Sequence, residues 1–433
     1  METFSAFLLL ACAVYCSVRS GFIQFRRFGA SLRCAIPRPS TGARVSPFEA
    51  AATSLAATIG TGNIAGVAGA ILLGGPGTIF WMWISAIFGM ASKYVEIYFG
   101  MRMRHAGAPG PLAYLRRLTP RGGLARVYAL LCAGCCLCMG NLVQVNTVSE
   151  AVLKLAQPAA ASTEGNLLPA LCVGTATLLL VALAQRGGAK SIGRIAALLV
   201  PFMSVLYIAG TLAVVVMNAA MLPAAFRAIL RDAWSEKAFL IGMARGVFTH
   251  EAGLGTAAFA HANADCADAH QEGLYGIFEV FFDTIVMCTL TALAVLVSGA
   301  VGGVSDGVQN SALVVDAFST IFGDVWAAVI IAVSLALFAF SSILSFAMYG
   351  SDCAGYLFGR RGGQCYRIVF LLLLPIGAAM RISLAWRLAE WANMALGVLN
   401  AAALVLLLRK PRLAGARRRA ATACAPSRAA SGE

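Results

Sequence analysis

Apolar stretches of membrane-spanning length, separated by short polar connections, recur along the whole of this 433-residue chain. A helix that crosses the hydrocarbon core of a bilayer needs about 20 mostly apolar residues. The pattern therefore predicts an all-α polytopic membrane protein. Ten stretches meet the requirement: 45–73, 76–101, 127–153, 166–184, 195–221, 238–260, 273–301, 325–350, 368–384 and 388–408.

A shorter apolar stretch, 4–18, precedes these ten and has two interpretations, a retained helix or a signal peptide. A signal peptide has a basic segment before its apolar core and small residues at a cleavage site after it. Here Glu2 is the only charged residue before the stretch, and a basic segment follows it. We therefore expect a retained helix and eleven transmembrane helices in all.

The composition agrees with a membrane protein, because 60% of the residues are apolar and only 12% are charged. Soluble domains carry about twice that share of charged residues. The net charge of +14 does not indicate a nucleic-acid partner, because such a partner requires a charged and solvated surface. We expect the lipid bilayer to surround the protein instead.

The basic residues fall mainly on one side of the predicted membrane. Basic residues are enriched in cytoplasmic loops. Of the 33 basic residues, 25 lie in the loop between the first two predicted helices, in every second loop after that one, or in the C-terminal tail. This distribution predicts a cytoplasmic membrane protein with its N-terminus outside and its C-terminus, a basic and disordered tail, in the cytoplasm.

Two of the apolar stretches contain residues that disfavour a continuous helix. The first is Gly60-Thr61-Gly62-Asn63, in which glycines and polar side chains fall in the middle of a span. Glycine weakens a helix by about 1 kcal/mol relative to alanine, and polar side chains are costly against lipid. A helix-packing face of small residues is the alternative. Because such a face needs neither Asn nor paired Thr, we favour a break in the helix.

The second interrupted stretch runs from residue 246 to 256 and places His250 and Glu251 beside Gly253-Leu254-Gly255. Burying an ionisable group in a membrane is expensive, so such a group indicates function. Glu251 has two interpretations, contact with a substrate or satisfaction of backbone amides freed by the break. Imidazole titrates near neutral pH, so His250 is a candidate proton site.

The two breaks fall in the first and sixth of the ten long helices. They are five helices apart, an odd number, so the two halves have opposite topology. This arrangement is typical of inverted-repeat transporters. It divides the chain into an N-terminal helix with a basic loop (1–44), a first five-helix repeat (45–222), a second inverted repeat (223–408) and the tail (409–433).

Several long motifs resemble the alanine or glycine:cation symporter family over residues 22–408. They include ATIGTGNIAGVAGAILLGGPGTIFWMW (57–83), GMASKYVE (89–96), FTHEAGLGTAAFAHA (248–262), GIFEVFFDTIVMCTLTAL (276–293) and WRLAEWANMALGVLN (386–400). The resemblance implies a LeuT-like fold of five plus five inverted helices, here with one extra N-terminal helix. It also implies Na⁺- or H⁺-coupled uptake of small amino acids.

The resemblance implies roles for particular residues. We expect the backbone amides of the first break to bind the substrate carboxylate, and the second break to hold the ammonium group and the side chain. Gln144, in a motif with Asn141 and Asn146, is expected to face the substrate or to bond between helices. The substrate-binding set is Gly60, Thr61, Gly62, Asn63, Gln144, Phe248, Thr249, Gly253 and Leu254.

A cation site is expected beside the first break, because a Na⁺ ion needs several oxygen ligands. By analogy with the inverted-repeat fold, paired hydroxyls would come from the eighth long helix. The predicted ligands are the carbonyls of Ala56, Ile59 and Phe338 and the hydroxyls of Ser341 and Ser342. Two further acids, Glu279 and Asp283, are candidates for a second cation or proton site, or for pairing with Lys93 or Arg245.

These features predict a secondary active transporter that couples Na⁺ to the uptake of alanine or glycine by alternating access. The alternatives are proton-coupled uptake of a different amino acid and a transporter-like amino-acid sensor. A channel filter ring and a protease constellation around His250 are not visible in the sequence. We expect no enzyme activity, no cofactor other than the co-transported ion, and a monomer.

Overall fold

The computed structural model describes residues 2–36, 45–104, 107–156, 167–303, 310–380 and 382–409. The predicted disordered tail, apart from Arg409, lies outside these residues, as does part of the predicted basic loop before residue 45. Regular structure in the described ranges is helical, with one isolated bridge between Val45 and Ala264. The prediction of an all-α protein is confirmed.

The first half of the chain forms a series of helices around one interrupted helix, α4–α5. The α-helices are α1 (Glu2–Ser20), α2 (Ile23–Arg26), α3 (Phe28–Cys34), α4 (Pro47–Thr58), α5 (Ala65–Gly74), α6 (Thr78–Arg102), α7 (Pro111–Leu115), α8 (Gly123–Leu137), α9 (Gln144–Ala156), α10 (Leu167–Ala184) and α11 (Gly188–Met217). A 3₁₀ turn, η1 (Thr61–Asn63), lies between α4 and α5, and a π-helix, η3 (Cys138–Val143), joins α8 to α9.

The second half repeats this theme, with an interruption between α13 and α14. Its α-helices are α12 (Leu222–Asp232), α13 (Glu236–His250), α14 (Ala257–Ala262), α15 (Ala269–Val280), α16 (Thr289–Val297), α17 (Asn310–Phe322), α18 (Asp324–Ala378) and α19 (Ile382–Arg409). The π-helix η7 (Phe281–Cys288) joins α15 to α16. The hydropathy pattern did not predict α12 or α17 as separate helices.

Helix α18 contains the predicted span 325–350 and most of the predicted span 368–384. It is not one straight helix, because Gly359 inside it has φ 73° and ψ −174°, far from helical values. Glycine adopts positive φ without the steric cost that a Cβ would bring. The two predicted spans therefore correspond to the parts of α18 before and after Gly359.

Five helical stretches in the described ranges are long and apolar enough to cross a membrane: Pro120–Leu153, Leu167–Met217, Ala269–Val297, Asp324–Ala378 and Trp386–Arg409. Their outer faces carry large exposed apolar side chains. Leu198 and Phe202 of α11, for example, are 78% and 60% exposed. Such surface would be unfavourable in water and is suited to lipid.

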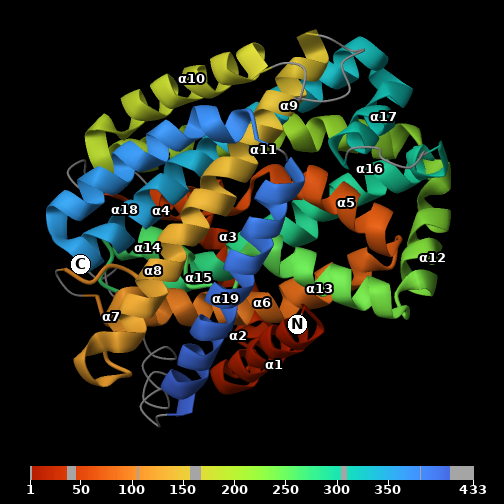
Figure 1. Cartoon of the computed structure of the whole chain (residues 1–433). Coiled ribbons are helices and arrows are strands. Elements are labelled where there is room, and N and C mark those ends of the chain that lie inside the picture. The colour runs from red at the N-terminus through yellow and green to blue at the C-terminus, as the bar shows by residue number, and fades with distance from the viewer. Residues whose placement is uncertain are drawn as a thin grey trace, which may run out of the picture.

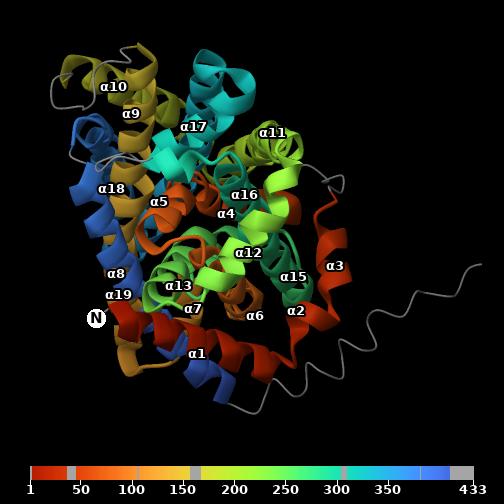
Figure 2. The same cartoon turned by 90° about the vertical axis from the view of Figure 1, so that its right-hand side faces the viewer.

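The interrupted helices lie in the interior, and other helices surround them (Figures 1 and 2). The first helix, α1, packs along the outside against α6 and α19. Helix α4 contacts α11, α14, α15 and α18, so its buried C-terminal end is surrounded by protein. A polar break at this position is therefore shielded from lipid, as irregular backbone inside a membrane must be.

Candidate functional site

The chain leaves helical geometry directly after α4, as the glycines predict. Ser46 and Glu49 form a capping box at the start of α4, and Pro47 occupies its first turn. At the other end, Ile59 has φ −76° and ψ 87°. The amide of Gly60 donates to Oδ1 of Asn63 at 3.0 Å and not to the carbonyl four residues earlier. The carbonyl of Ala56 is consequently released from the helical hydrogen-bond ladder.

The released Ala56 carbonyl lies beside two hydroxyls of α18. Ser342 Oγ is 2.9 Å from Ala56 O and 3.0 Å from Phe338 O. Ser341 Oγ is 2.8 Å from Phe338 O and 3.5 Å from Ala56 O. The structure thus brings four predicted cation ligands together, and Ile59 lies at the end of the same helix. Neutral oxygens converging at one buried point form a site that suits a hard monovalent cation.

Gly60 lies between this oxygen cluster and Gln144. A Cβ at Gly60 would be 2.8 Å from Ser342 Oγ and 3.4 Å from the amide group of Gln144, so no larger residue fits without a shift. Oε1 of Gln144 in turn accepts the hydroxyl of Thr61 at 3.2 Å and its amide at 3.4 Å. Gln144 therefore contacts the first break, whereas Asn141 and Asn146 donate to carbonyls of α18 and of Met380.

The second interrupted helix contacts the first at Gly62. A Cβ at Gly62 would be 3.5 Å from Thr249 and 3.6 Å from the Phe248 ring. The Phe248 ring packs on Trp386, with their centroids 5.2 Å apart. Backbone from the first break, the apolar ring of Phe248 and the hydroxyl of Thr249 therefore border one region. This combination can bind a small zwitterion by its polar end and enclose its side chain.

Asn63 connects the first break to a buried acid on η7. Its Nδ2 donates to Asp283 Oδ1 at 2.7 Å, while its Oδ1 accepts from Gly60. Asp283 Oδ2 accepts the hydroxyl of Thr284 at 2.8 Å. Asp283 is fully buried, and no ion pair joins it to a cation in the described part of the chain. It therefore supports the conformation of the break through Asn63.

Three residues with positive φ make the second break. Glu251 ends α13 with φ 54°, and Gly253 and Gly255 follow with φ values of 89° and 91°. The glycines are suited to this conformation because they have no Cβ. Glu251 bears a strain of about 1–2 kcal/mol there. Its Oε2 accepts the hydroxyl of Thr256 at 2.6 Å, and no described group donates to its other oxygen, Oε1.

Glu96 of α6, and not Glu251, satisfies the amides that this break releases. Its Oε2 accepts from the amide of Gly253 at 3.1 Å and from the amide of Gly255 at 2.9 Å. Two carbonyls of this break are also hydrogen-bonded. Gly253 O accepts from Nδ2 of Asn400 at 2.8 Å, and Leu254 O accepts from the hydroxyl of Tyr128 at 2.7 Å. These contacts place Gly253 and Leu254 against α6, α8 and α19. In the described part of the chain, the second break contacts Gly62 through Phe248 and Thr249 and not through Gly253 or Leu254.

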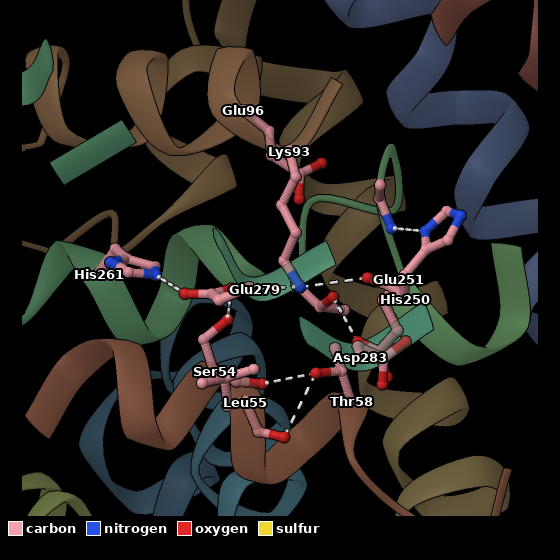
Figure 3. Close-up of polar contacts among 12 residues, drawn as sticks. Ser54, Leu55, Thr58, Lys93, Glu96, His250, Glu251, His261, Glu279 and Asp283 are labelled. Carbon is pink, nitrogen blue, oxygen red and sulfur yellow. Dashed lines mark hydrogen bonds and ion pairs between the residues drawn. The ribbon is translucent and has the colours of Figure 1, made fainter. Parts of the chain in front are cut away.

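Lys93 is fully buried at the centre of the polar contacts in Figure 3. Its ammonium nitrogen lies 3.2 Å from Glu279 Oε2 and donates to the carbonyl of His250 at 3.1 Å. Glu279 Oε2 also accepts the hydroxyl of Ser54 at 2.6 Å. The network therefore joins α6, the end of α13, α15 and α4. Of the predicted alternatives for Glu279, the structure shows the ion pair with Lys93; Arg245 pairs with Glu390.

His261 of α14 completes this network. Its Nδ1 lies 2.8 Å from Glu272 and its Nε2 2.7 Å from Glu279 (Figure 3 shows the second contact). Two ionised carboxylates can accept from both ring nitrogens only when the ring is an imidazolium, in which both nitrogens donate. The charges of Lys93 and His261 then balance those of Glu272 and Glu279. A balanced and hydrogen-bonded group of charges is the form in which burial is tolerated.

His250 has a different environment from His261. Its Nδ1 accepts the amide of Ala252 at 3.0 Å, so its Nε2 carries the proton and donates to Ser85 Oγ at 2.9 Å. A second proton would break the bond to Ala252 and place a cation next to the Lys93 ammonium, which bonds the His250 carbonyl. The geometry therefore corresponds to a neutral imidazole with both nitrogens engaged.

Glu96 and His261 were not predicted as site residues, and Lys93 was predicted only as a possible partner of the buried acids. The signal was present in the sequence, because all three are ionisable residues in or next to predicted spans. Their pairing could not be derived from it, since the partners lie on helices that are distant in the chain.

Comparisons with known proteins identify a family that this chain resembles over nearly its whole length. The model of the sodium:alanine symporter family matches residues 1–414. The chain is 36% identical to the sodium/alanine symporter AgcS of Methanococcus maripaludis, over 92% of this chain and 90% of that protein. It is 32% identical to the probable sodium/glutamine symporter GlnT of Bacillus subtilis, over 92% of this chain and 84% of that protein.

Among solved structures, the chain is similar to MhsT in complex with L-phenylalanine. The TM-score is 0.66, and the match covers 86% of this chain and 90% of MhsT at 15% sequence identity. At this identity the likeness concerns the fold, which the two proteins share.

Proposed function

Because this chain belongs to the sodium:alanine symporter family, we propose that it moves alanine or glycine into the cell together with Na⁺. Cation-coupled amino-acid symport follows from the family. The narrower choice of substrate and ion is our proposal. The observation that carries it is the buried cluster of Ala56 O, Phe338 O and the hydroxyls of Ser341 and Ser342, which directly adjoins Gly60.

The cation is proposed to bind within this oxygen cluster. Ser342 Oγ donates to Ala56 O in the described conformation. A cation would replace the hydroxyl hydrogen as the partner of these oxygens, and both hydroxyls would then turn their lone pairs toward it. The site contains no carboxylate, so its net charge suits one monovalent ion. Binding there would hold the end of α4 against α18, which fixes the adjoining break.

The amino acid is proposed to bind between the two breaks. In the described conformation the amides of Gly60 and Thr61 donate to the side-chain oxygens of Asn63 and Gln144. A substrate carboxylate would replace these oxygens as the acceptor of the two amides. Phe248 would limit the size of the substrate side chain. The cation site and the substrate site meet at Gly60, so occupancy of one favours the other, and this coupling is reciprocal.

We propose that the fold comprises eleven transmembrane helices, with five-plus-five inverted repeats after α1. Two observations support this: the breaks occur in the first and sixth long helices, and the fold is shared with MhsT. The distribution of basic residues supports a place in the cytoplasmic membrane, with the N-terminus outside and the C-terminus inside. We assign Glu96, Glu251 and Asp283 to support of the breaks, and His250 to a neutral structural role.

The test compares two serine substitutions one helical turn apart. Ser342→Ala removes a proposed cation ligand. Ser345→Ala is the matched control, because Ser345 also donates from α18 to a carbonyl of α4, that of Thr53 at 2.8 Å, outside the oxygen cluster. We expect Ser342→Ala to raise the Na⁺ concentration needed for half-maximal alanine uptake by at least about tenfold, and Ser345→Ala to leave it near the wild-type value. Equal effects of the two substitutions would refute the site.

A further inference from the structure

A basic cavity outside the transport site opens between the segment that precedes α8 and the end of the first part of α18. Its volume is about 390 Å³. An adjoining cavity of about 370 Å³ shares Gly107 and Tyr356 with it. Helices α8 and α18 pack against each other, and Tyr366 of α18 donates to the carbonyl of Ala133 in α8 at 2.8 Å. We call the first cavity the arginine pocket; it is lined by Gly107, Arg116, Arg121, Arg126, Tyr356 and Leu357.

The three arginines of this pocket have no counter-charge among the residues that the structure describes. All three side chains are exposed, and none of their guanidinium groups makes an ion pair or hydrogen bond with any group in the described part of the chain. Three like charges around one cavity repel one another and attract an anion. Guanidinium groups present several donors in a planar fork that matches phosphate oxygens. The chemistry of the lining therefore favours a phosphate group.

The turn that carries Arg121 is held in an unusual conformation. Arg121 has φ 58°, and Gly122 after it has φ 68°. A non-glycine residue in this region bears a strain of about 1–2 kcal/mol. A Cβ on Gly122 would be 3.2 Å from Arg116 and 3.5 Å from the Tyr356 hydroxyl, so the turn packs closely on two other residues of the pocket. The packing thus fixes Arg116 and Arg121 at the same cavity.

Exposed apolar side chains begin where the pocket ends. Val127 and Leu130, which follow Arg126 in α8, are 51% and 62% exposed. Phe358, which follows Leu357 in α18, is 71% exposed. Exposed apolar surface of this kind faces acyl chains in a membrane protein. The arginine pocket therefore lies at the border between exposed apolar surface and polar loops, which is the position that a phospholipid headgroup requires.

We propose that the arginine pocket binds the phosphate of an anionic phospholipid, whose acyl chains lie along Val127, Leu130 and Phe358. Basic pockets between transmembrane helices on the cytoplasmic side are suited to such headgroups. The loop between α6 and α8 is on the side that the charge distribution assigns to the cytoplasm. Asp352 lines the adjoining cavity and not the arginine pocket, so it leaves the three-arginine site available to an anion. The lipid would hold the turn at Arg121 against the bend at Gly359.

The experiment measures lipid binding by native mass spectrometry and by the rise in unfolding temperature of detergent-purified protein. The probes are cardiolipin, phosphatidylglycerol, phosphatidylcholine and inorganic phosphate, each at matched phosphate concentration. The pocket variant carries Arg116→Gln, Arg121→Gln and Arg126→Gln. The control carries Arg33→Gln, Arg186→Gln and Arg194→Gln, which change the net charge equally at exposed positions outside the pocket.

We expect the anionic lipids to bind and stabilise the wild type and the control, and phosphatidylcholine and inorganic phosphate to do so much less. Each arginine near an anionic lipid contributes about a fivefold factor in affinity, so the pocket variant should bind about a hundredfold more weakly. Equal weakening in both variants would overturn the proposal, because it would show a general effect of charge. Equal stabilisation of the wild type by inorganic phosphate would overturn the assignment to a lipid.

Discussion

Removal of the Glu279 carboxylate tests the buried charge network most sharply. In Glu279→Gln the side chain keeps its shape and loses its charge. The Lys93 ammonium, 3.2 Å away and fully buried, then has the His250 carbonyl as its other described partner. An amide also has a single acceptor oxygen, whereas Glu279 accepts from Lys93 and Ser54 on one oxygen and from His261 on the other.

The expected cost follows from these contacts. A pair of unit charges 3.2 Å apart interacts with about 5 kcal/mol at an effective dielectric constant of about 20. Breaking a buried ion pair by removing one partner typically costs about 3–5 kcal/mol, since an uncompensated charge remains. We expect Glu279→Gln to lower the free energy of unfolding by about 3–5 kcal/mol. The double variant Lys93→Met/Glu279→Gln should be more stable than Glu279→Gln alone, because it removes the stranded charge.

The assay is equilibrium unfolding in mixed micelles, followed by tryptophan fluorescence at fixed lipid and detergent composition. Glu390→Gln is the matched control, because Glu390 pairs with Arg245 at 2.8 Å but its side chain is 40% exposed. Exposed pairs contribute about 0–1 kcal/mol. If Glu279→Gln and Glu390→Gln cost the same, or if the double variant is less stable than Glu279→Gln, the inferred role of the Lys93–Glu279 pair is wrong.

Three further predictions concern the breaks. Gly60→Ala should lower uptake about 5- to 150-fold, because its Cβ would be 2.8 Å from Ser342 Oγ and overpacking costs about 1–3 kcal/mol. The control is Gly66→Ala, whose Cβ meets nothing within 4 Å. Equal uptake in both variants would contradict the expectation. Asn63→Ala should abolish uptake with normal membrane insertion, since the variant loses the bonds to Gly60 and Asp283; full uptake would remove Asn63 from the site. His250→Asn should leave the pH profile of uptake unchanged, because the imidazole is neutral in its contacts; a flattened profile would identify His250 as a proton carrier.

The two breaks could be predicted from sequence because their causes are local. The glycines and polar residues at 60–63 weaken the helix by themselves, and Gly253 and Gly255 supply the positive φ that the second break uses. The serine pair was predicted through a family resemblance, and the structure shows its physical basis. The Ala56 carbonyl becomes available because Asn63 takes the Gly60 amide.

The network around Lys93 could not be predicted in this way. Its members lie on α4, α6, α14 and α15, and which acid meets which base depends on how these helices pack. The sequence left Glu279 with several roles, and the geometry shows an ion pair. Similarly, the carbonyls of Gly253 and Leu254 bond to Asn400 and Tyr128, which are contacts between residues more than 100 positions apart.

The central claim is that a Na⁺ gradient drives alanine or glycine into the cell. The most direct measurement is uptake of labelled alanine by purified protein in proteoliposomes, with Na⁺ or H⁺ gradients imposed separately. We predict accumulation above equilibrium with an inward Na⁺ gradient, competition by glycine, and loss of accumulation when Na⁺ is equal on both sides. Accumulation driven by a proton gradient without Na⁺, or no alanine accumulation under either gradient, would contradict the account.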